Sequence, residues 1–258
     1  MTWLTIYYLI KSINGEKHPG CLDRCLPGGD ELKSLAALFS GGKDSTYAIY
    51  KVEETGFRVD LLLTVYPSSP DSLYFHYPNI KLTELQAEAM RKKHVTMKAG
   101  DDELKILRSL IEKISREVDG IVLGVSSSTF QKNAVEKLCR EYGLDLHTPL
   151  WGMDPSKLLE DIVESGFQVI VTGVAALGLG REWLGRILSK EEIDELKEIS
   201  RRYGVNISGE GGEMETIVLD SPIFKEKIEI LDYEIEWKMD RGFFIIKKAR
   251  LKEKAILL

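Results

Sequence analysis

Apolar and polar positions change their period several times along the chain, and these changes predict alternating strands and helices. Short, nearly continuous apolar runs are typical of strands buried on both faces, and amphipathic segments with a helical period are typical of surface helices. The predicted strands are 34–39, 59–65, 95–97 and 120–125, the predicted helices are 44–54, 82–92, 103–117 and 130–142, and a polar and aromatic loop is predicted at 67–78. Alternation at this spacing favours right-handed crossovers, so we expect an α/β fold built on a doubly wound parallel sheet.

The pattern changes after Pro149, where strands and helices no longer alternate regularly. Near the C-terminus the apolar alternation slips by one residue between Ile230 and Leu231, which predicts a β-bulge within a hairpin. The predicted elements are helices 155–164 and 190–203, a strand at 168–174, a glycine- and glutamate-rich turn at 209–215, and a hairpin that turns at 240–242. We therefore expect two parts, a first domain at 32–147 and a smaller C-terminal α+β subdomain at 148–258.

Residues 1–31 are predicted to be a non-native or disordered leader. The codons for 28–30 can form a strong prokaryotic ribosome-binding sequence, and a codon for Leu32 can serve as an alternative start. The nucleotide sequence would decide this, because other codons at those positions exclude the hypothesis. The alternative is a genuine N-terminal extension, in which half of a metal site would be formed by His18, Cys21 and Cys25.

Composition and charge limit the class of protein. The chain has 258 residues, of which 43% are hydrophobic and 29% are charged, and its formal net charge is −6. An acidic balance without a long basic run argues against a nucleic-acid partner. Three cysteines are too few for a disulfide scaffold, which favours a reducing, cytoplasmic location. No apolar run approaches the roughly 20 residues needed to span a bilayer, so no membrane partner is expected, and a homodimer is left open.

A glycine-rich loop lies where the first predicted strand gives way to the first predicted helix, at the ligand-binding edge of an open α/β sheet. It reads Ser40, Gly41, Gly42, Lys43, Asp44, Ser45. The glycines let backbone N–H groups approach an anion, the helix N-terminus adds unsatisfied donors, and Lys43 adds positive charge. Asp44 would repel a bare phosphate, so we expect it to face Mg²⁺ or to cap the helix. The spacing is not that of a Walker loop.

This loop resembles Ser-Gly-Gly-x-Asp-Ser, the signature of the PP-loop ATP pyrophosphatases. That superfamily has an adenine nucleotide alpha hydrolase-like fold and cleaves ATP between the α and β phosphates. The resemblance implies that residues 40–45 hold the pyrophosphate part of ATP, with Lys43 and Asp44 as catalytic residues and Asp44 as the Mg²⁺ ligand. It also implies that Gly124, near the end of the fourth predicted strand, belongs to the nucleotide site.

The second half resembles the diphthine–ammonia ligase family, in its archaeal type. The segment 209–216 reads Gly-Glu-Gly-Gly-Glu-Met-Glu-Thr, and further matching stretches lie at 74–76, 85–89, 150–152 and 183–186. That family amidates diphthine, a modified histidine on translation elongation factor 2, through an acyl-adenylate, with release of AMP and pyrophosphate. The resemblance implies a substrate site formed by His76, Glu210, Gly211, Gly212, Glu213, Glu215 and Thr216.

The acidic side chains of 209–216 suit cationic substrates. Diphthine carries a quaternary ammonium and ammonium is itself a cation, so these glutamates could attract either one or could carry Mg²⁺. The alternative interpretation of the same segment is a solvated acidic turn. No glutaminase segment is visible in the sequence, so free ammonia is the expected nitrogen donor.

One stretch departs from the family pattern and leaves the acceptor substrate open. The family usually shows Ser-Asp-Tyr-Gln-Arg-x-Arg-Val-Glu, whereas residues 128–136 read Ser-Thr-Phe-Gln-Lys-Asn-Ala-Val-Glu. One alternative is another PP-loop enzyme that modifies tRNA or forms a small-molecule amide. Sulfur transfer to tRNA needs a reactive cysteine, and Cys139 is expected to be inert packing within a helix. The other alternative is a non-catalytic sensor of adenine nucleotides.

Overall fold

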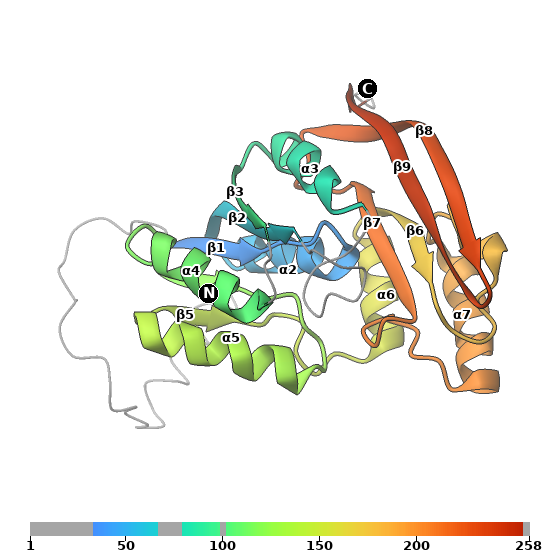
Figure 1. Cartoon of the computed structure of the whole chain (residues 1–258), viewed down its shortest axis with the longest axis horizontal. Helices are drawn as coiled ribbons and strands as arrows, with labels where there is room; N and C mark the ends of the chain where they lie inside the picture. Colours follow the sequence, from blue (N-terminus) through green and yellow to red (C-terminus); the bar gives the residue numbers. More distant parts are fainter. Residues whose placement is uncertain (1–32, 67–78, 99–101, 255–258) are drawn as a thin grey trace, which may run out of the picture. The chain divides into compact units, whose positions relative to one another are not determined.

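A five-stranded parallel sheet forms the first part of the fold (Figure 1). The computed structural model describes residues 33–66, 79–98 and 102–254, all within one compact unit. The strand order is β3-β2-β1-β4-β5, and each neighbouring pair is parallel. The strands are β1 (Ser34–Leu38), β2 (Arg58–Tyr66), β3 (Lys93–Lys98), β4 (Gly120–Val122) and β5 (Asp145–His147).

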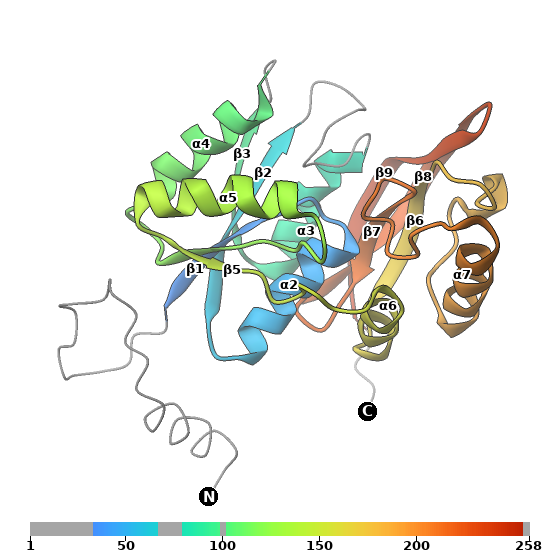
Figure 2. The ribbon, with the colours of Figure 1, turned by 90° about the horizontal axis from the view of Figure 1, so that it is seen from below.

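Helices cover both faces of this sheet (Figure 2). They are α2 (Lys43–Glu54), α3 (Leu82–Met90), α4 (Glu103–Ile114) and α5 (Thr129–Tyr142), with a short 3₁₀ turn, η1 (Asn79–Lys81), before α3. Along β1, Ala36 packs in the core under α4 and α5, while its neighbours Leu35 and Ala37 pack in the core under α2 and α3. Burial on both faces explains the continuous apolar run in this strand. The predicted doubly wound α/β fold is therefore confirmed.

The differences from the predicted elements are small in this part. The predicted helix at 82–92 ends at Met90, because Arg91 adopts the left-handed conformation with φ of 55°. The predicted helix at 103–117 ends at Ile114. The sequence pattern does not predict β5, because its three residues are Asp-Leu-His and only one of them is apolar.

A four-stranded antiparallel sheet, in the order β7-β6-β9-β8, forms the second part. Its elements are α6 (Pro155–Glu164), β6 (Gln168–Val174), η2 (Arg181–Trp183), α7 (Lys190–Tyr203), β7 (Met214–Asp220), β8 (Glu226–Lys238) and β9 (Arg241–Glu253). The bulge predicted in the hairpin is confirmed by a register shift between Ile230 and Asp232. One hydrophobic core runs from α2 into this sheet and includes both Ile49 and Val169. The boundary at 148 and the leader at 1–31 stay predictions.

The turn of the β8–β9 hairpin lies before the predicted position. The prediction of a turn at 240–242 is right for Asp240 and wrong for residues 241–242, because the turn residues are Met239 and Asp240. Gly242 is a strand residue, and a Cβ on it would lie 2.4 Å from the ring of Trp237. Close packing, and not turn geometry, therefore requires glycine at that position.

The predicted turn at 209–215 is wrong in its last two residues. Strand β7 begins at Met214, so Glu215 and the following Thr216 are strand residues. Glu215 pairs with Gly173 of β6 in an antiparallel register. The alternation of polar and apolar side chains in this short stretch is weak, and pairing with a strand distant in sequence decides its conformation.

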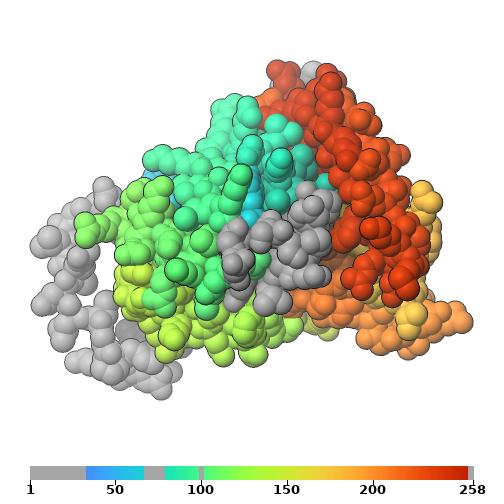
Figure 3. Space-filling model, viewed as in Figure 1, coloured from blue at the N-terminus to red at the C-terminus, as the bar shows by residue number. Residues whose placement is uncertain are grey.

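The β8–β9 hairpin packs against α3, and the space-filling view shows the two in contact (Figure 3). Asn79, just before α3, is buried and donates its side-chain amide to the carbonyl oxygen of Phe244 at 2.8 Å. The backbone N–H of Ile246 donates to the side-chain oxygen of Asn79 at 2.9 Å. One buried side chain thus connects the parallel-sheet part to the hairpin.

Candidate functional site

The loop 40–45 connects β1 to α2, as the sequence predicts. Gly41 has φ of +79°, in the left-handed region that favours glycine, and a Cβ there would lie 2.2 Å from Oε1 of Gln86. Gly42 differs from it, because its backbone is extended and it forms the N-cap of α2. Both the backbone conformation and the available space therefore require glycine at Gly41.

The carbonyl group of Gly41 is anchored to the second sheet. Its oxygen accepts hydrogen bonds from the backbone N–H of Val218 at 3.0 Å and from Nε2 of Gln86 at 2.8 Å. The carbonyl and N–H groups of a trans peptide point in opposite directions, so this anchor also fixes the direction of the Gly42 N–H. The sequence pattern does not predict these hydrogen bonds of Gln86, because its two partners lie 45 and 132 positions away along the chain.

Lys43 is a buried cation at the start of α2. Its Nζ donates to Oδ2 of Asp44 at 2.7 Å and to the carbonyl oxygen of Ser208, and its side chain is 3% exposed. Its backbone N–H donates to Oγ1 of Thr216 on β7 at 3.2 Å. The sequence-predicted residues Lys43, Asp44 and Thr216 are therefore brought together from opposite halves of the chain.

Asp44 has one carboxylate oxygen engaged and one without a partner among the described residues. Oδ2 accepts from Lys43, whereas Oδ1 is buried and has no hydrogen-bond partner. Burial raises the pKa of Asp44, the Lys43 ammonium opposes this, and the nearby Glu210 carboxylate reinforces it. The helix N-cap is Gly42, so Asp44 does not cap α2, and the first of the two roles predicted for it remains.

The remaining residues of the predicted nucleotide site are the two serines at the ends of the loop and a glycine after β4. Ser40 and Ser45 lie with their hydroxyl oxygens 3.2 Å apart, and the hydroxyl of Ser45 donates to the carbonyl of Gly42 at 3.2 Å. Gly124, just after β4, lies against α2, and a Cβ on it would lie 2.6 Å from the backbone oxygen of Asp44. The predicted nucleotide-site residues thus meet at the carboxyl edge of the sheet.

Glu210 has its carboxylate held by three consecutive serines at the N-terminus of α5. Its Oε1 accepts from the backbone N–H groups of Ser126, Ser127 and Ser128 at 3.0 to 3.1 Å. Its Oε2 accepts from the hydroxyls of Ser126, at 2.6 Å, and Ser127. Burial raises the pKa of Glu210, but these hydrogen bonds outweigh it and lower the pKa to about 2. The sequence did not reveal this contact, which joins segments more than 80 residues apart.

The other two glutamates of 209–216 lie in different surroundings. Glu213 does not line the pocket beside the loop, although one of its carboxylate oxygens is buried without a partner. Glu215 does line that pocket, and burial raises its pKa to about 7. The interpretation of the whole segment as a solvated acidic turn is therefore wrong for Glu210 and Glu215.

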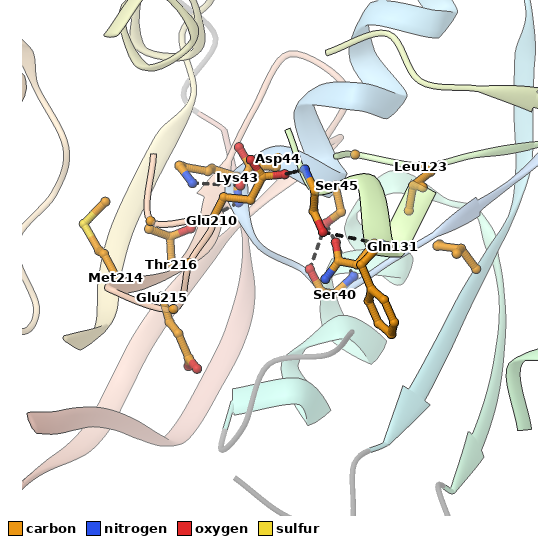
Figure 4. A pocket seen from close by; sticks show the side chains of 17 residues that line it. Ser40, Lys43, Asp44, Ser45, Leu123, Gln131, Glu210, Met214, Glu215 and Thr216 are labelled. Atoms are coloured by element: carbon orange, nitrogen blue, oxygen red, sulfur yellow. Dashed lines mark hydrogen bonds and ion pairs between the residues drawn. The ribbon is translucent and has the colours of Figure 1, made fainter. Parts of the chain in front are cut away.

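One pocket of about 370 Å³ contains most of the sequence-predicted site residues (Figure 4). Figure 4 shows Lys43, Asp44 and Glu210 gathered at one side, with Ser40 and Ser45 beside them and Glu215 directed away from that group. Its lining residues are Leu38, Ser40, Lys43, Asp44, Ser45, Leu123, Gly124, Ser128, Phe130, Gln131, Gly209, Glu210, Gly211, Gly212, Met214, Glu215 and Thr216. His76 and the predicted loop at 67–78 lie outside the described residues.

The pocket offers one carboxylate that fits a divalent cation. Within 33–66, 79–98 and 102–254, no group of three or more His, Cys, Asp and Glu side chains could hold a metal ion. The unpartnered Oδ1 of Asp44 is the donor that a Mg²⁺ ion would find here. Such an ion is commonly bound through one or two carboxylates, with substrate phosphates and waters as the other ligands. The residues present therefore fit Mg²⁺ brought together with a nucleotide.

Cys139 is buried in the core between α4, α5 and the sheet. Burial raises the pKa of its thiol to about 12, so it is not a thiolate at neutral pH. This confirms that Cys139 is packing and argues against sulfur transfer through it. Among the described helices, none has the length and apolar character that crossing a bilayer requires.

Comparison with known proteins agrees with this arrangement. Residues 33–146 match the model of the diphthamide synthase N-terminal domain, and residues 154–252 match that of the diphthamide synthase C-terminal domain. The diphthine–ammonia ligase of Bos taurus is 35% identical over 225 residues, which cover 78% of this chain and 84% of the relative. The chain belongs to the diphthine–ammonia ligase family.

A second family member, the diphthine–ammonia ligase of Homo sapiens, is 33% identical over 225 residues, covering 78% of this chain and 84% of the relative. A crystal structure described as a predicted subunit of tRNA methyltransferase, from Methanocaldococcus jannaschii, aligns with a TM-score of 0.43 at 17% identity. That alignment covers 74% of this chain and 98% of the other.

Proposed function

We propose that this chain uses ATP to amidate diphthine on translation elongation factor 2, forming diphthamide, AMP and pyrophosphate through an acyl-adenylate. The observation that supports it most directly is that the loop 40–45 and the segment 209–216 line one pocket. The first would bind ATP and the second the acceptor. The two reactants of an adenylation would then meet between the two sheets.

In this proposal the start of α2 binds the pyrophosphate part of ATP. The unsatisfied N–H groups of a helix N-terminus attract phosphate oxygens, and the buried Lys43 ammonium adds a positive charge at the same end. Mg²⁺ held by Asp44 would neutralise charge on the phosphates. Asp44 would thereby serve two cations, the Lys43 ammonium through Oδ2 and the metal through Oδ1.

The first chemical step joins the diphthine carboxylate to the α-phosphate. A carboxylate oxygen forms the new P–O bond, and the bond between the α and β phosphates breaks as pyrophosphate leaves. Negative charge grows on the leaving group, so the task of Lys43 and the helix N-terminus is electrostatic stabilisation. Ammonia then forms the C–N bond, and AMP leaves with the electrons of the C–O bond.

The acceptor would lie along the 209–216 side of the pocket. Gly211 and Gly212 leave backbone exposed there, which lets a modified histidine side chain approach closely. Phe130 is 63% exposed and lines the same pocket, and its ring face suits the quaternary ammonium of diphthine. Contacts of Glu213 and His76 with the acceptor stay predictions, as does the archaeal type of the enzyme.

Pyrophosphate release by the purified chain with ATP and Mg²⁺ tests the proposal, with and without diphthine-bearing elongation factor 2. We expect release that depends on the factor, with ammonia consumed and diphthamide detected by mass spectrometry. A cytoplasmic location is part of this proposal. Tight ATP binding without turnover would instead favour a nucleotide sensor, and turnover stimulated by tRNA would favour a tRNA-modifying enzyme.

A further inference from the structure

The glutamates of 209–216 that line the pocket are not equivalent. The Glu210 carboxylate is saturated by donors from Ser126, Ser127 and Ser128. The Glu215 carboxylate makes no hydrogen bond or ion pair with any described residue. Both glutamates line the same pocket, and of these two Glu215 is the one whose carboxylate has open acceptor sites.

The position of Glu215 is fixed by the strand pairing beneath it. Glu215 on β7 lies opposite Gly173 on β6. A Cβ on Gly173 would lie 3.0 Å from Cβ and 3.3 Å from Oε2 of Glu215, so the absent side chain leaves the space that the carboxyl occupies. The next residue, Thr216, contacts the backbone of Lys43. Strand β7 therefore fixes the position of Glu215, beside the residue that contacts the nucleotide loop.

We propose that Glu215 binds an ammonium ion in this pocket and takes a proton from it, producing the ammonia that attacks the acyl-adenylate. This inference rests on the proposed function, because it assigns the nitrogen side of the same reaction. A partly buried, unpartnered carboxylate favours a small cation, which can approach closely and donate a hydrogen bond to each oxygen.

The proton balance is simple. At neutral pH the nitrogen source is mostly ammonium, which has no lone pair with which to attack. One proton moves from ammonium to the Glu215 carboxylate, giving ammonia and a neutral carboxyl group. The nitrogen lone pair then forms the C–N bond, the C–O bond to AMP breaks, and the second proton passes to water. Glu215 returns its proton to solvent before the next turnover.

The acid strengths of the two carboxyls agree with this assignment. Burial raises the pKa of Glu215 to about 7, which makes it a useful proton acceptor near neutral pH. The serine donors lower the pKa of Glu210 to about 2, despite the opposing effect of burial, so that carboxylate is a very weak base.

Glu215→Gln, tested in the full chain with two nitrogen donors, examines the proposal. Glutamine has the same shape, and burial disfavours the charge that it removes, so the variant is expected to fold. With ammonium chloride we expect amide formation to fall about a hundred-fold or more. With hydroxylamine, an amine already neutral at pH 7, hydroxamate formation should stay within a few-fold of wild type. Factor-dependent pyrophosphate release should also persist.

The exposed Glu117 provides the control, since Glu117→Gln removes one carboxylate outside the pocket and should change neither donor's rate. Equal loss with ammonium and hydroxylamine in Glu215→Gln would overturn the proposal, because the side chain would then serve adenylation or folding. Unchanged ammonium-dependent activity would overturn it as well. The proposed function itself would be contradicted if the wild-type chain released no pyrophosphate with diphthine-bearing elongation factor 2. That result differs from the two outcomes above, which concern only the Glu215→Gln variant.

Discussion

The side-chain amide of Gln86 donates to the carbonyl oxygens of Gly41 and Val218, at 2.8 and 2.9 Å. One fully buried side chain on α3 thereby joins the loop that begins α2 to a strand of the second sheet. Gln86 does not line the pocket, yet it holds the backbone from which the loop's N–H groups are directed. The geometry of the candidate nucleotide site therefore depends on a residue outside it.

Gln86→Leu should weaken ATP binding and lower stability. Leucine keeps much of the volume but removes both hydrogen bonds, which leaves buried carbonyl groups with fewer donors. We expect the free energy of unfolding to fall by about 1–3 kcal/mol and the KM for ATP to rise roughly tenfold. Denaturant unfolding and pyrophosphate release measure the two effects. Glu88→Gln, at an exposed position of the same helix, is the control. An unchanged KM in Gln86→Leu would contradict this positioning role.

Gly124→Ala should damage the site through a steric clash. The added Cβ would lie 2.6 Å from the backbone oxygen of Asp44 and 2.8 Å from Cα of Ser45, so either α2 or the segment after β4 must move. We expect pyrophosphate release to fall about a hundred-fold, since a shift of about 1 Å in positioning can cost that much.

Gly143→Ala is the matched control for the glycine substitution. Gly143 ends α5 with φ of +69°, and nothing lies within 4 Å of a Cβ there. That variant should lose about 1 kcal/mol of stability from left-handed strain while its activity stays unchanged. Equal activity of the Gly124 and Gly143 variants would show that close contact at Gly124 does not matter.

Glu210→Gln should destabilise the chain in a pH-dependent way. The pKa of Glu210 is lowered from 4.5 to about 2, so its ionised form stabilises the fold fully above about pH 5, and this is lost as pH falls towards 2. Because Glu210 is partly exposed, solvent screens these interactions, and we expect the ionised carboxylate to contribute about 1–2 kcal/mol to the free energy of unfolding. Unfolding at pH 7 and at pH 3 measures it, and the gap between wild type and variant should narrow at pH 3. A gap that widened there would contradict the serine-held carboxylate.

Asp44→Ala should abolish turnover while the fold persists. The change removes the buried, unpartnered oxygen proposed to bind Mg²⁺ and the ion-pair partner of Lys43. We expect the rate of pyrophosphate release to fall at least about a hundred-fold, because the bound Mg²⁺ would no longer stabilise the charge on the phosphates. Asp240→Ala, at the exposed hairpin turn, should keep full activity. Retained activity in Asp44→Ala would mean that the loop is wrongly assigned.

Local sequence pattern was enough for most of the fold. The apolar run of β1, buried on both faces, and the amphipathic period of α4 are encoded within each segment, and both elements were predicted from it. The loop 40–45 could likewise be recognised, because a strand, a glycine turn and a helix follow one another directly. Chemistry carried by adjacent residues is visible in the sequence.

The features that the sequence does not predict depend on contacts between segments far apart along the chain. β5 is too short to have a periodic pattern, and the start of β7 is set by its partner β6. The hydrogen bond from Gln86 to Gly41 and those from the serines to Glu210 join segments that lie tens of residues apart. The local sequence pattern therefore cannot predict them. The hairpin turn was misplaced because Gly242 looks like a turn residue but serves packing against Trp237.

The fate of a labelled carboxylate oxygen tests adenylation most directly. Diphthine-bearing elongation factor 2 is prepared with heavy oxygen in the diphthine carboxylate and reacted with the wild-type chain, ATP, Mg²⁺ and ammonia. Attack on the α-phosphate followed by amide formation transfers one labelled oxygen to AMP, which mass spectrometry detects. Labelled AMP, formed in equal amount with diphthamide, is the predicted result. Unlabelled AMP, or label in inorganic phosphate formed together with ADP, would contradict an acyl-adenylate.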